Sequence, residues 1–195
     1  MPLLALPAPE PALRCAVTAL GSPTAVHRDR TPALSSQTGP LSPDSPLPVH
    51  VLEHVDGRQE PPRSRLTGWR FLIRNADRAV AAAETVLTAD GWAFSHFFEG
   101  PYIASTERAL AQAAALPTAY QPRLLSVPGL YMLTLWLRAE TGAEASGGQP
   151  APADLLVPLA PAPPGIASHR PHPVAELLPL LRLRSGPDQI LLPQP

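Results

Sequence analysis

The amino-acid sequence predicts an α+β fold: a two-layer sandwich with a mainly antiparallel sheet of four to five strands, one long Ala-rich helix and one short C-terminal helix. Three observations support this prediction. All ten aromatic residues lie between Trp69 and Trp136. Segments of that window alternate apolar and polar residues with the period of a strand, and one Ala-rich run has the composition of a helix. Because aromatic side chains bury the largest areas, we expect the core in this window.

The flanks predict disorder. Residues 1–65 contain twelve of the 28 prolines and no aromatic residue, and they show neither strand nor helix periodicity. We therefore predict a disordered Pro/Ala/Ser-rich arm over 1–65, an α+β domain over 66–184 and a disordered tail over 185–195. All fifteen basic residues are Arg, a bias that indicates a GC-rich genome. A start site assigned too far upstream is a second interpretation of the arm.

The first half of the predicted domain consists of strands. From Leu66, the apolar residues Trp69, Phe71 and Ile73 alternate with Arg70 and Arg74, which predicts a half-buried strand ending near 75–77. Residues 79–88 fit a strand or a short helix, and their β-branched residues favour the strand. Asp90-Gly91 predicts a hairpin turn. In the following strand, simple alternation places four rings on one face: Trp92, Phe94, His96 and Phe98.

The second half begins with the clearest helix. Pro101 is tolerated in a first helical turn, and the Ala-rich run that follows ends before Pro117. Residues 124–127 and 130–137 predict strands separated by a bulge or tight turn, with 130–137 as the central strand. A flexible loop over 139–153 precedes a strand over 154–159, where Pro158 indicates an edge. Residues 174–183 predict a short helix weakened by Pro179.

Composition excludes several functions. The sequence has no Lys, which excludes phosphate-binding loops of the P-loop type, Schiff-base enzymes and protein kinases. The only thiol, Cys15, gives no basis for a disulfide framework or a Cys-ligated metal. The net charge of −1 does not favour nucleic acid or an anionic membrane. We expect no cofactor and no membrane span, and we place the chain in the cytoplasm.

One motif has the form of a zinc signature. His50, Glu53 and His54 match HxxEH, in which two His on one helical face bind zinc and Glu activates water. The match lies in the proline-rich arm, two residues after Pro48, where a helix of more than two turns is not expected. We therefore predict no metal site.

Two further patterns point to an enzyme or to RNA binding. His96 is an acid/base candidate beside the aromatic cluster, with Glu99 or Glu84 as its carboxylate partner, and such a His–carboxylate pair would suit a small hydrolase or isomerase. Arg70 and Arg74, interleaved with rings, resemble an RNA-binding sheet. However, residues 66–138 are nearly balanced in charge, whereas nucleic-acid surfaces are strongly basic. Both functions are alternatives.

The first hypothesis is a non-enzymatic binding or assembly module. Rings gather where the predicted strand 92–98 meets the helix at Gly100-Pro101, a type of junction that often carries recognition. These rings fit a cap on the core as well as a binding surface. We expect a protein partner or a second copy of the chain, bound through Trp92, His96, Phe98 and Tyr102.

Overall fold

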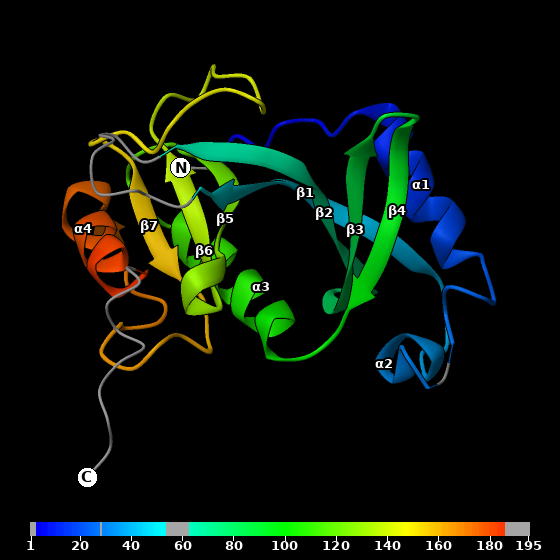
Figure 1. Ribbon diagram of the computed structural model, residues 1–195. Coiled ribbons are helices and arrows are strands. Elements are labelled where there is room, and N and C mark those ends of the chain that lie inside the picture. Colours follow the sequence, from blue (N-terminus) through cyan, green and yellow to red (C-terminus); the bar gives the residue numbers. More distant parts are fainter. Residues whose placement is uncertain (1–2, 28, 54–62, 186–195) are drawn as a thin grey trace, which may run out of the picture.

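The computed structural model describes residues 3–27, 29–53 and 63–185 (Figure 1). Its helices are α1 (Glu10–Leu20), α2 (Pro32–Ser35), α3 (Pro101–Ala114) and α4 (Val174–Ser185), with a 3-10 turn η1 (Pro128–Leu130). Its strands are β1 (Leu41–Leu52), β2 (Ser64–Asn75), β3 (Arg78–Thr88), β4 (Gly91–Phe98), β5 (Gln121–Val127), β6 (Met132–Arg138), β7 (Leu155–Pro158) and β8 (His172–Pro173).

The strands form one mixed sheet of eight strands in the order β4-β3-β2-β1-β5-β6-β7-β8. All neighbours are antiparallel except β1 and β5, which are parallel. The predicted sheet of four to five mainly antiparallel strands is therefore wrong. Two strands of the observed sheet were not predicted, namely β1, in the segment expected to be disordered, and the two-residue β8; in addition, all six segments predicted as strands belong to this one sheet.

The disordered arm is also wrong, because α1, α2 and β1 lie within residues 1–65. Prolines occur where a backbone N–H is not needed. Pro11 and Pro32 occupy first helical turns. Along β1, the three prolines precede residue 49, and only Val49–Val51 pair with β5 as well as β2. The proline-bearing part of β1 has a sheet neighbour on one side alone, which is where strand prolines are tolerated. The predicted tail lies outside the described residues apart from Ser185.

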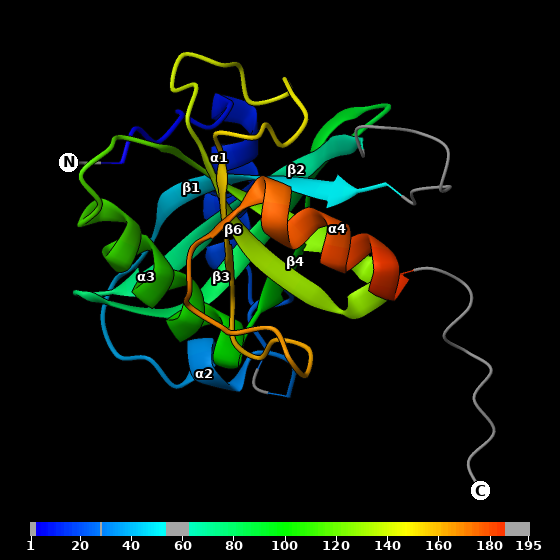
Figure 2. The ribbon, with the colours of Figure 1, turned by 90° about the vertical axis from the view of Figure 1, so that its left-hand side faces the viewer.

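Helices cover both faces of the sheet, so the fold has three layers instead of the two predicted (Figures 1 and 2). Helix α3 packs on one face, against Leu124, Leu135 and Leu137 at one end and Leu72 and Ala82 at the other. The opposite face is covered by α4 over β5–β7 and by α1 over β2–β4. Figure 1 shows α4 and α1 at opposite ends of the sheet.

The predicted central strand corresponds to β6, whose seven residues are all buried. It is not central, because β1 and β5 occupy the middle of the sheet. The predicted edge strand is β7, which β8 covers through two pairs. No described helix has the length and apolarity needed to cross a membrane.

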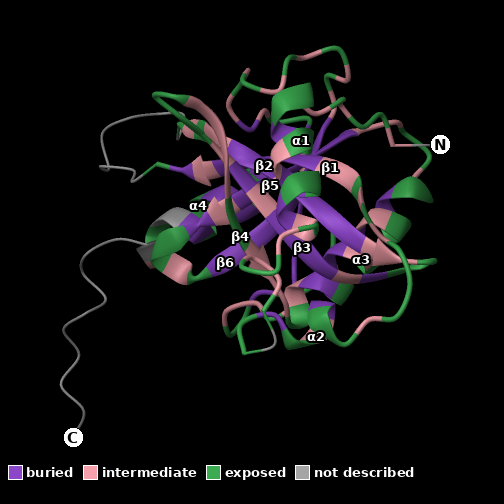
Figure 3. Cartoon of the chain, turned by 90° about the vertical axis from the view of Figure 1, so that its right-hand side faces the viewer, coloured by how far each residue is buried: buried purple, intermediate pink, exposed green. Residues whose placement is uncertain are grey.

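Helix α1 covers the aromatic rings of the core with small side chains. Ala12 and Ala16 have no exposed surface and pack in the cluster that contains Trp69 and Phe71, both 1% exposed. Figure 3, which faces this end of the sheet, shows α1 exposed on its outer side with buried strands behind it. Trp69, Phe71 and Trp136 are buried in the core, whereas Tyr131 is 93% exposed, and the ring-free α1 completes the core around Trp69 and Phe71.

Substitutions on α1 test whether this helix belongs to the fold. Ala16→Glu places a carboxylate against the buried rings and is expected to lower the free energy of unfolding by about 3 kcal/mol. Val17→Glu changes the next residue, which is 51% exposed, and is expected to shift stability by less than about 0.5 kcal/mol. Chemical denaturation of the full chain measures both. Equal, small effects would mean that α1 does not pack on the sheet.

Candidate functional site

Strand β4 is an open sheet edge. It is the terminal strand of the sheet, and no described segment pairs with its outer side. Its sequence, Gly-Trp-Ala-Phe-Ser-His-Phe-Phe, contains no proline and no Asp, Glu, Lys or Arg. Natural edge strands are usually protected by such residues against pairing with other chains. The other edge of the sheet is the two-residue β8, which ends in Pro173 and leads directly into α4.

A β-bulge at Ser95 divides the rings of β4 between two faces. Thr85 pairs with Phe94 and Glu84 pairs with His96, which leaves Ser95 as an extra residue. Phe94 and Phe97 therefore share a face, with ring centroids 4.7 Å apart. The four rings that alternation placed together are separated. Trp92 and Phe94 pack toward α1, whereas Phe98 packs on the α3 face and contacts the His96 ring, with centroids 3.9 Å apart and planes tilted by 54°.

A shallow apolar groove lies between α1 and β4. It has a volume of about 390 Å³ and is lined by Arg14, Cys15, Thr18, Ala19, Ser22, Ala25 and Phe94. At one end, the Cys15 thiol donates to the Trp92 carbonyl at 3.3 Å. Helix α1 therefore engages the start of the edge, and the free part runs from Ala93 to Phe98. Leu87, 63% exposed and paired with Trp92, extends the apolar surface.

On the opposite face, Phe98 and Tyr102 line a separate cavity of about 320 Å³ at the strand-to-helix junction. The structure thus brings together two of the four predicted contacts, Phe98 and Tyr102, with the His96 ring in contact with Phe98. Trp92 belongs to the α1 side.

The acid/base candidates do not converge on one reacting position. Glu84 lies opposite His96 across the strands, but its carboxylate accepts from both Nε and Nη2 of Arg70, at 3.0 and 2.6 Å. The Glu99 carboxylate accepts from the backbone N–H groups of Ala33 and Leu34 and thereby holds the start of α2. In the described part of the chain, neither carboxylate hydrogen-bonds His96, whose Nδ1 contacts the Ser95 hydroxyl at 2.8 Å.

The two arginines considered for RNA are both committed to ion pairs. Arg70 pairs with Glu84, and the two side chains are 11% and 15% exposed. Arg74 pairs with Asp44 at 2.7 Å and with Glu107 at 2.8 Å. A phosphate would have to replace carboxylates already in place.

Of the HxxEH residues, His50 lies near the end of β1 and Glu53 directly follows this strand. His50 is fully buried in β1, its ring meets Trp136 edge-on at 5.1 Å, and Glu53 lies near Arg65 at 3.8 Å. His54 lies outside the described residues. The described residues contain no group of His, Cys, Asp or Glu that could hold a metal ion.

His50 belongs to a buried polar network around Arg123. The Arg123 guanidinium, with no exposed surface, donates to the Gln121 side chain and to the carbonyls of Glu144, Ala145 and Gly147. These carbonyls belong to the predicted loop 139–153, which the network attaches to β5. Burial, together with the nearby Arg138, lowers the pKa of Arg123 to about 10, so the group remains charged at neutral pH.

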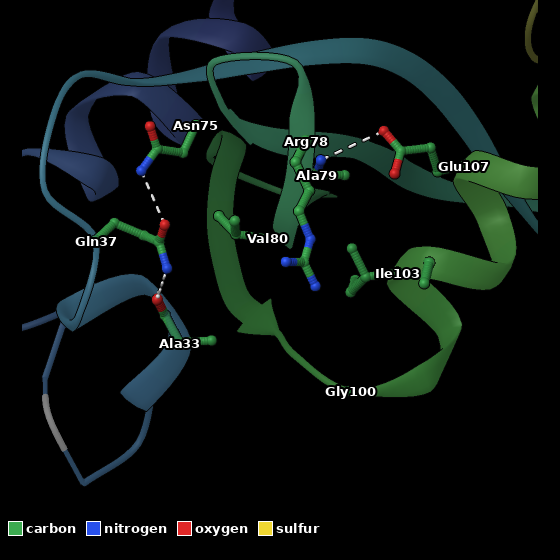
Figure 4. A pocket seen from close by; sticks show the side chains of 10 residues that line it. Ala33, Gln37, Asn75, Arg78, Ala79, Val80, Gly100, Ile103 and Glu107 are labelled. Atoms are coloured by element: carbon green, nitrogen blue, oxygen red, sulfur yellow. Dashed lines mark hydrogen bonds between the residues drawn. The ribbon is translucent and has the colours of Figure 1, made fainter.

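A third hollow, of about 390 Å³, lies between α2, β3 and α3 (Figure 4). On one wall Asn75 donates to Gln37, which donates to the Ala33 carbonyl, both at 2.8 Å. On the other, Glu107 accepts from the Ala79 backbone N–H. Figure 4 shows Arg78 reaching between these walls. We therefore assign the Asn75–Gln37–Ala33 contacts to holding α2 against the sheet and the Ala79–Glu107 contact to holding α3 against β3.

Sequence reasoning missed the α1 side of the groove and two residues of the junction cavity, Ser126 and Tyr131. A signal for α1 was present: Pro11 in a first turn, followed by Ala12, Ala16 and Ala19 at helical spacing. Ser126 and Tyr131 are distant from Phe98 in the sequence, and the folding of the sheet brings them to the same cavity.

Three comparisons with known proteins find no relative. No protein family, no curated protein and no solved structure matches the chain.

The buried His50 predicts a pH dependence of stability. Burial, reinforced by the Arg123 guanidinium, lowers the pKa of His50 from 6.5 to about 4. Between these values the unfolded chain binds a proton that the folded chain does not, so stability falls as the pH is lowered from 6.5 to 4. The loss from this group is about 3 kcal/mol.

The measurement is chemical denaturation at a series of pH values between 4 and 7. His50→Gln keeps an acceptor for Arg123 but cannot titrate, and it is expected to flatten the profile. His27→Gln, at an exposed histidine outside β4, is the matched control for the removal of one imidazole. An unchanged slope in His50→Gln would exclude His50 as the source.

Proposed function

We propose that this protein is a non-enzymatic assembly module that pairs with a second copy of itself through β4. The open, uncharged edge of β4 carries the proposal. An exposed edge offers unpaired backbone groups to an added strand, and neighbouring pockets take alternate side chains of that strand. The groove beside Phe94 lies where an added strand would place side chains on the α1 side.

The second copy is favoured because β4 carries both parts of a self-complementary contact. In an antiparallel pair related by a two-fold axis, β4 would face its own uncharged sequence, so no like charges would oppose each other. Its rings at Phe94 and Phe97 are apolar side chains of the kind that the groove accepts. The ion pair at the rim, Arg14 with Glu10 at 2.6 Å, is neutral as a unit, and the net charge of −1 adds little repulsion between copies.

The expected assembly is a closed dimer. A two-fold contact uses the same patch on both copies, and the opposite edge of the sheet is short and ends in Pro173. Growth into a filament would require a second open edge. The acid/base alternative is less supported, because Arg70 and the α2 backbone occupy the carboxylates. RNA binding is less supported because Arg70 and Arg74 are paired.

Light scattering coupled to size exclusion, on the full chain over a range of concentrations, tests the proposal. The parent is expected to have twice the mass of one chain. Ser95→Lys puts a cation on the exposed bulge of the edge and is expected to weaken dimerisation at least about tenfold, since two like charges would meet across the pair. Thr18→Trp is expected to weaken it without adding charge, by filling the groove.

Gln112→Lys, on the exposed side of α3, is the charge-matched control and should remain dimeric. A monomer at every concentration would contradict the proposal, as would a dimer that Ser95→Lys and Thr18→Trp leave unchanged. If the chain is a monomer and an unrelated extended peptide shifts the amide signals of β4, the edge binds a different protein and the dimer proposal is wrong.

A further inference from the structure

From the cavity where β4 meets α3, we infer a second binding site, for a small, flat, uncharged molecule that carries a hydrogen-bond acceptor such as an aromatic amide or ketone. This site does not rest on the pairing of β4. Phe98 reaches it from the α3 face of the strand, whereas the groove occupied in the dimer lies on the α1 face.

The cavity has the size and lining of a small-ligand site. Its volume of about 320 Å³ falls near the lower end of the range for such sites, about 300 to 1,000 Å³. Leu72, Ile103, Met132 and Leu133 provide apolar walls, Phe98 and Tyr102 line it with their rings, and Tyr131 lies at its mouth. An aromatic ring between these walls would exchange water contacts for stacking and edge contacts.

Two polar groups line the cavity with hydrogen-bonding capacity to spare. Arg70 uses Nε and Nη2 on Glu84 and stacks on Phe98 at 4.2 Å from its ring centroid. Within the described residues, Nη1 of Arg70 and the hydroxyl of Ser126 have no hydrogen-bond partner. Nη1 of Arg70 can only donate, and the Ser126 hydroxyl can donate as well as accept, so the pair favours a ligand that presents an acceptor.

The charges around the cavity favour a neutral ligand. Arg70 is the one cation in its lining, and the Glu84 carboxylate already neutralises it at 2.6 Å. The Glu99 carboxylate also lines the cavity while holding α2. An anionic ligand would face this carboxylate without an unpaired cation to offset it, and a cationic ligand would face the Arg70 guanidinium.

Tyr131 is the feature that points most directly to a ligand. Its backbone has a φ of +49°, a left-handed conformation that is unfavourable for a bulky residue, and the residue is 93% exposed. The Tyr102 hydroxyl lies 3.2 Å from the Tyr131 carbonyl and 2.9 Å from the Pro161 carbonyl; its one proton is shared between these two acceptors and ties the segment to α3. A large ring is thus kept at the mouth of the cavity on a strained backbone, a combination that is enriched at functional sites.

Titration of the 15N-labelled full chain with benzamide, followed by amide chemical shifts, tests the inference. Saturable millimolar binding is expected, with the largest shifts at Tyr102, Thr106 and Ser126. Tyr131→Gly removes the ring and suits the left-handed backbone, so the variant should fold; it is expected to weaken binding about five- to tenfold. Ser126→Phe fills the cavity and should abolish binding. Leu183→Ala, at an exposed position on α4, is the control and should bind as the parent does.

Benzoate, of the same size but charged, is expected to bind more weakly than benzamide. Tighter binding of benzoate would overturn the uncharged class of ligand. Shifts that do not saturate, that lie elsewhere on the chain, or that persist at equal affinity in Tyr131→Gly would overturn the site. None of these results depends on whether the chain is a dimer, so failure here and failure of the assembly proposal can be told apart.

Discussion

The fold depends on the pairing of β1 with both of its neighbours. Strands β2, β3 and β4 form one antiparallel set, and β5 to β8 form another; β1 is the strand that joins them. Its contact with β2 extends over most of its length, whereas its parallel contact with β5 is confined to Val49–Val51. Without this strand, α3 would pack on two separate sheets, and the cavity lined by β2, α3 and β6 would have no fixed shape.

The short junction between β1 and β5 is reinforced by buried polar contacts. His50, in the middle of the parallel pairing, accepts from Arg123 on β5 at 3.4 Å. The Arg123 guanidinium also donates to backbone carbonyls of the loop after β6. Nearby, the Asp154 carboxylate accepts from the Trp136 indole and from two backbone N–H groups. Five donors in a planar fork allow Arg to satisfy several carbonyls at once, which an ammonium group could not do with the same geometry. Arg at position 123 therefore suits this buried network better than Lys would.

The sequence predicted the elements after residue 64 well because their signals are local. Alternation around Phe71 and the Asp90-Gly91 turn are visible within a few residues, and the structure has strands and a hairpin there. Residues 1–65 were wrongly predicted to be disordered, because the number of prolines and the absence of aromatic residues do not show that β1 pairs with strands much later in the chain. Phe98 and Tyr102 were identifiable as neighbours in sequence, whereas Ser126 and Tyr131 join them only through the sheet. The bulge at Ser95 shifts the alternation of β4, so the rings that simple alternation placed on one face lie on two faces of the sheet.

The position of β1 has a consequence for synthesis on the ribosome. Val49 is made early, but its parallel partner Leu124 follows 75 residues later, so the two halves of the sheet cannot join until β5 has left the exit tunnel. Until then, β1 pairs on one side alone, and the nascent chain presents two open strand edges. Such non-local pairing slows folding and exposes intermediates to aggregation. The prolines that interrupt β1 before Val49 shorten the edge that this unfinished chain offers to its neighbours.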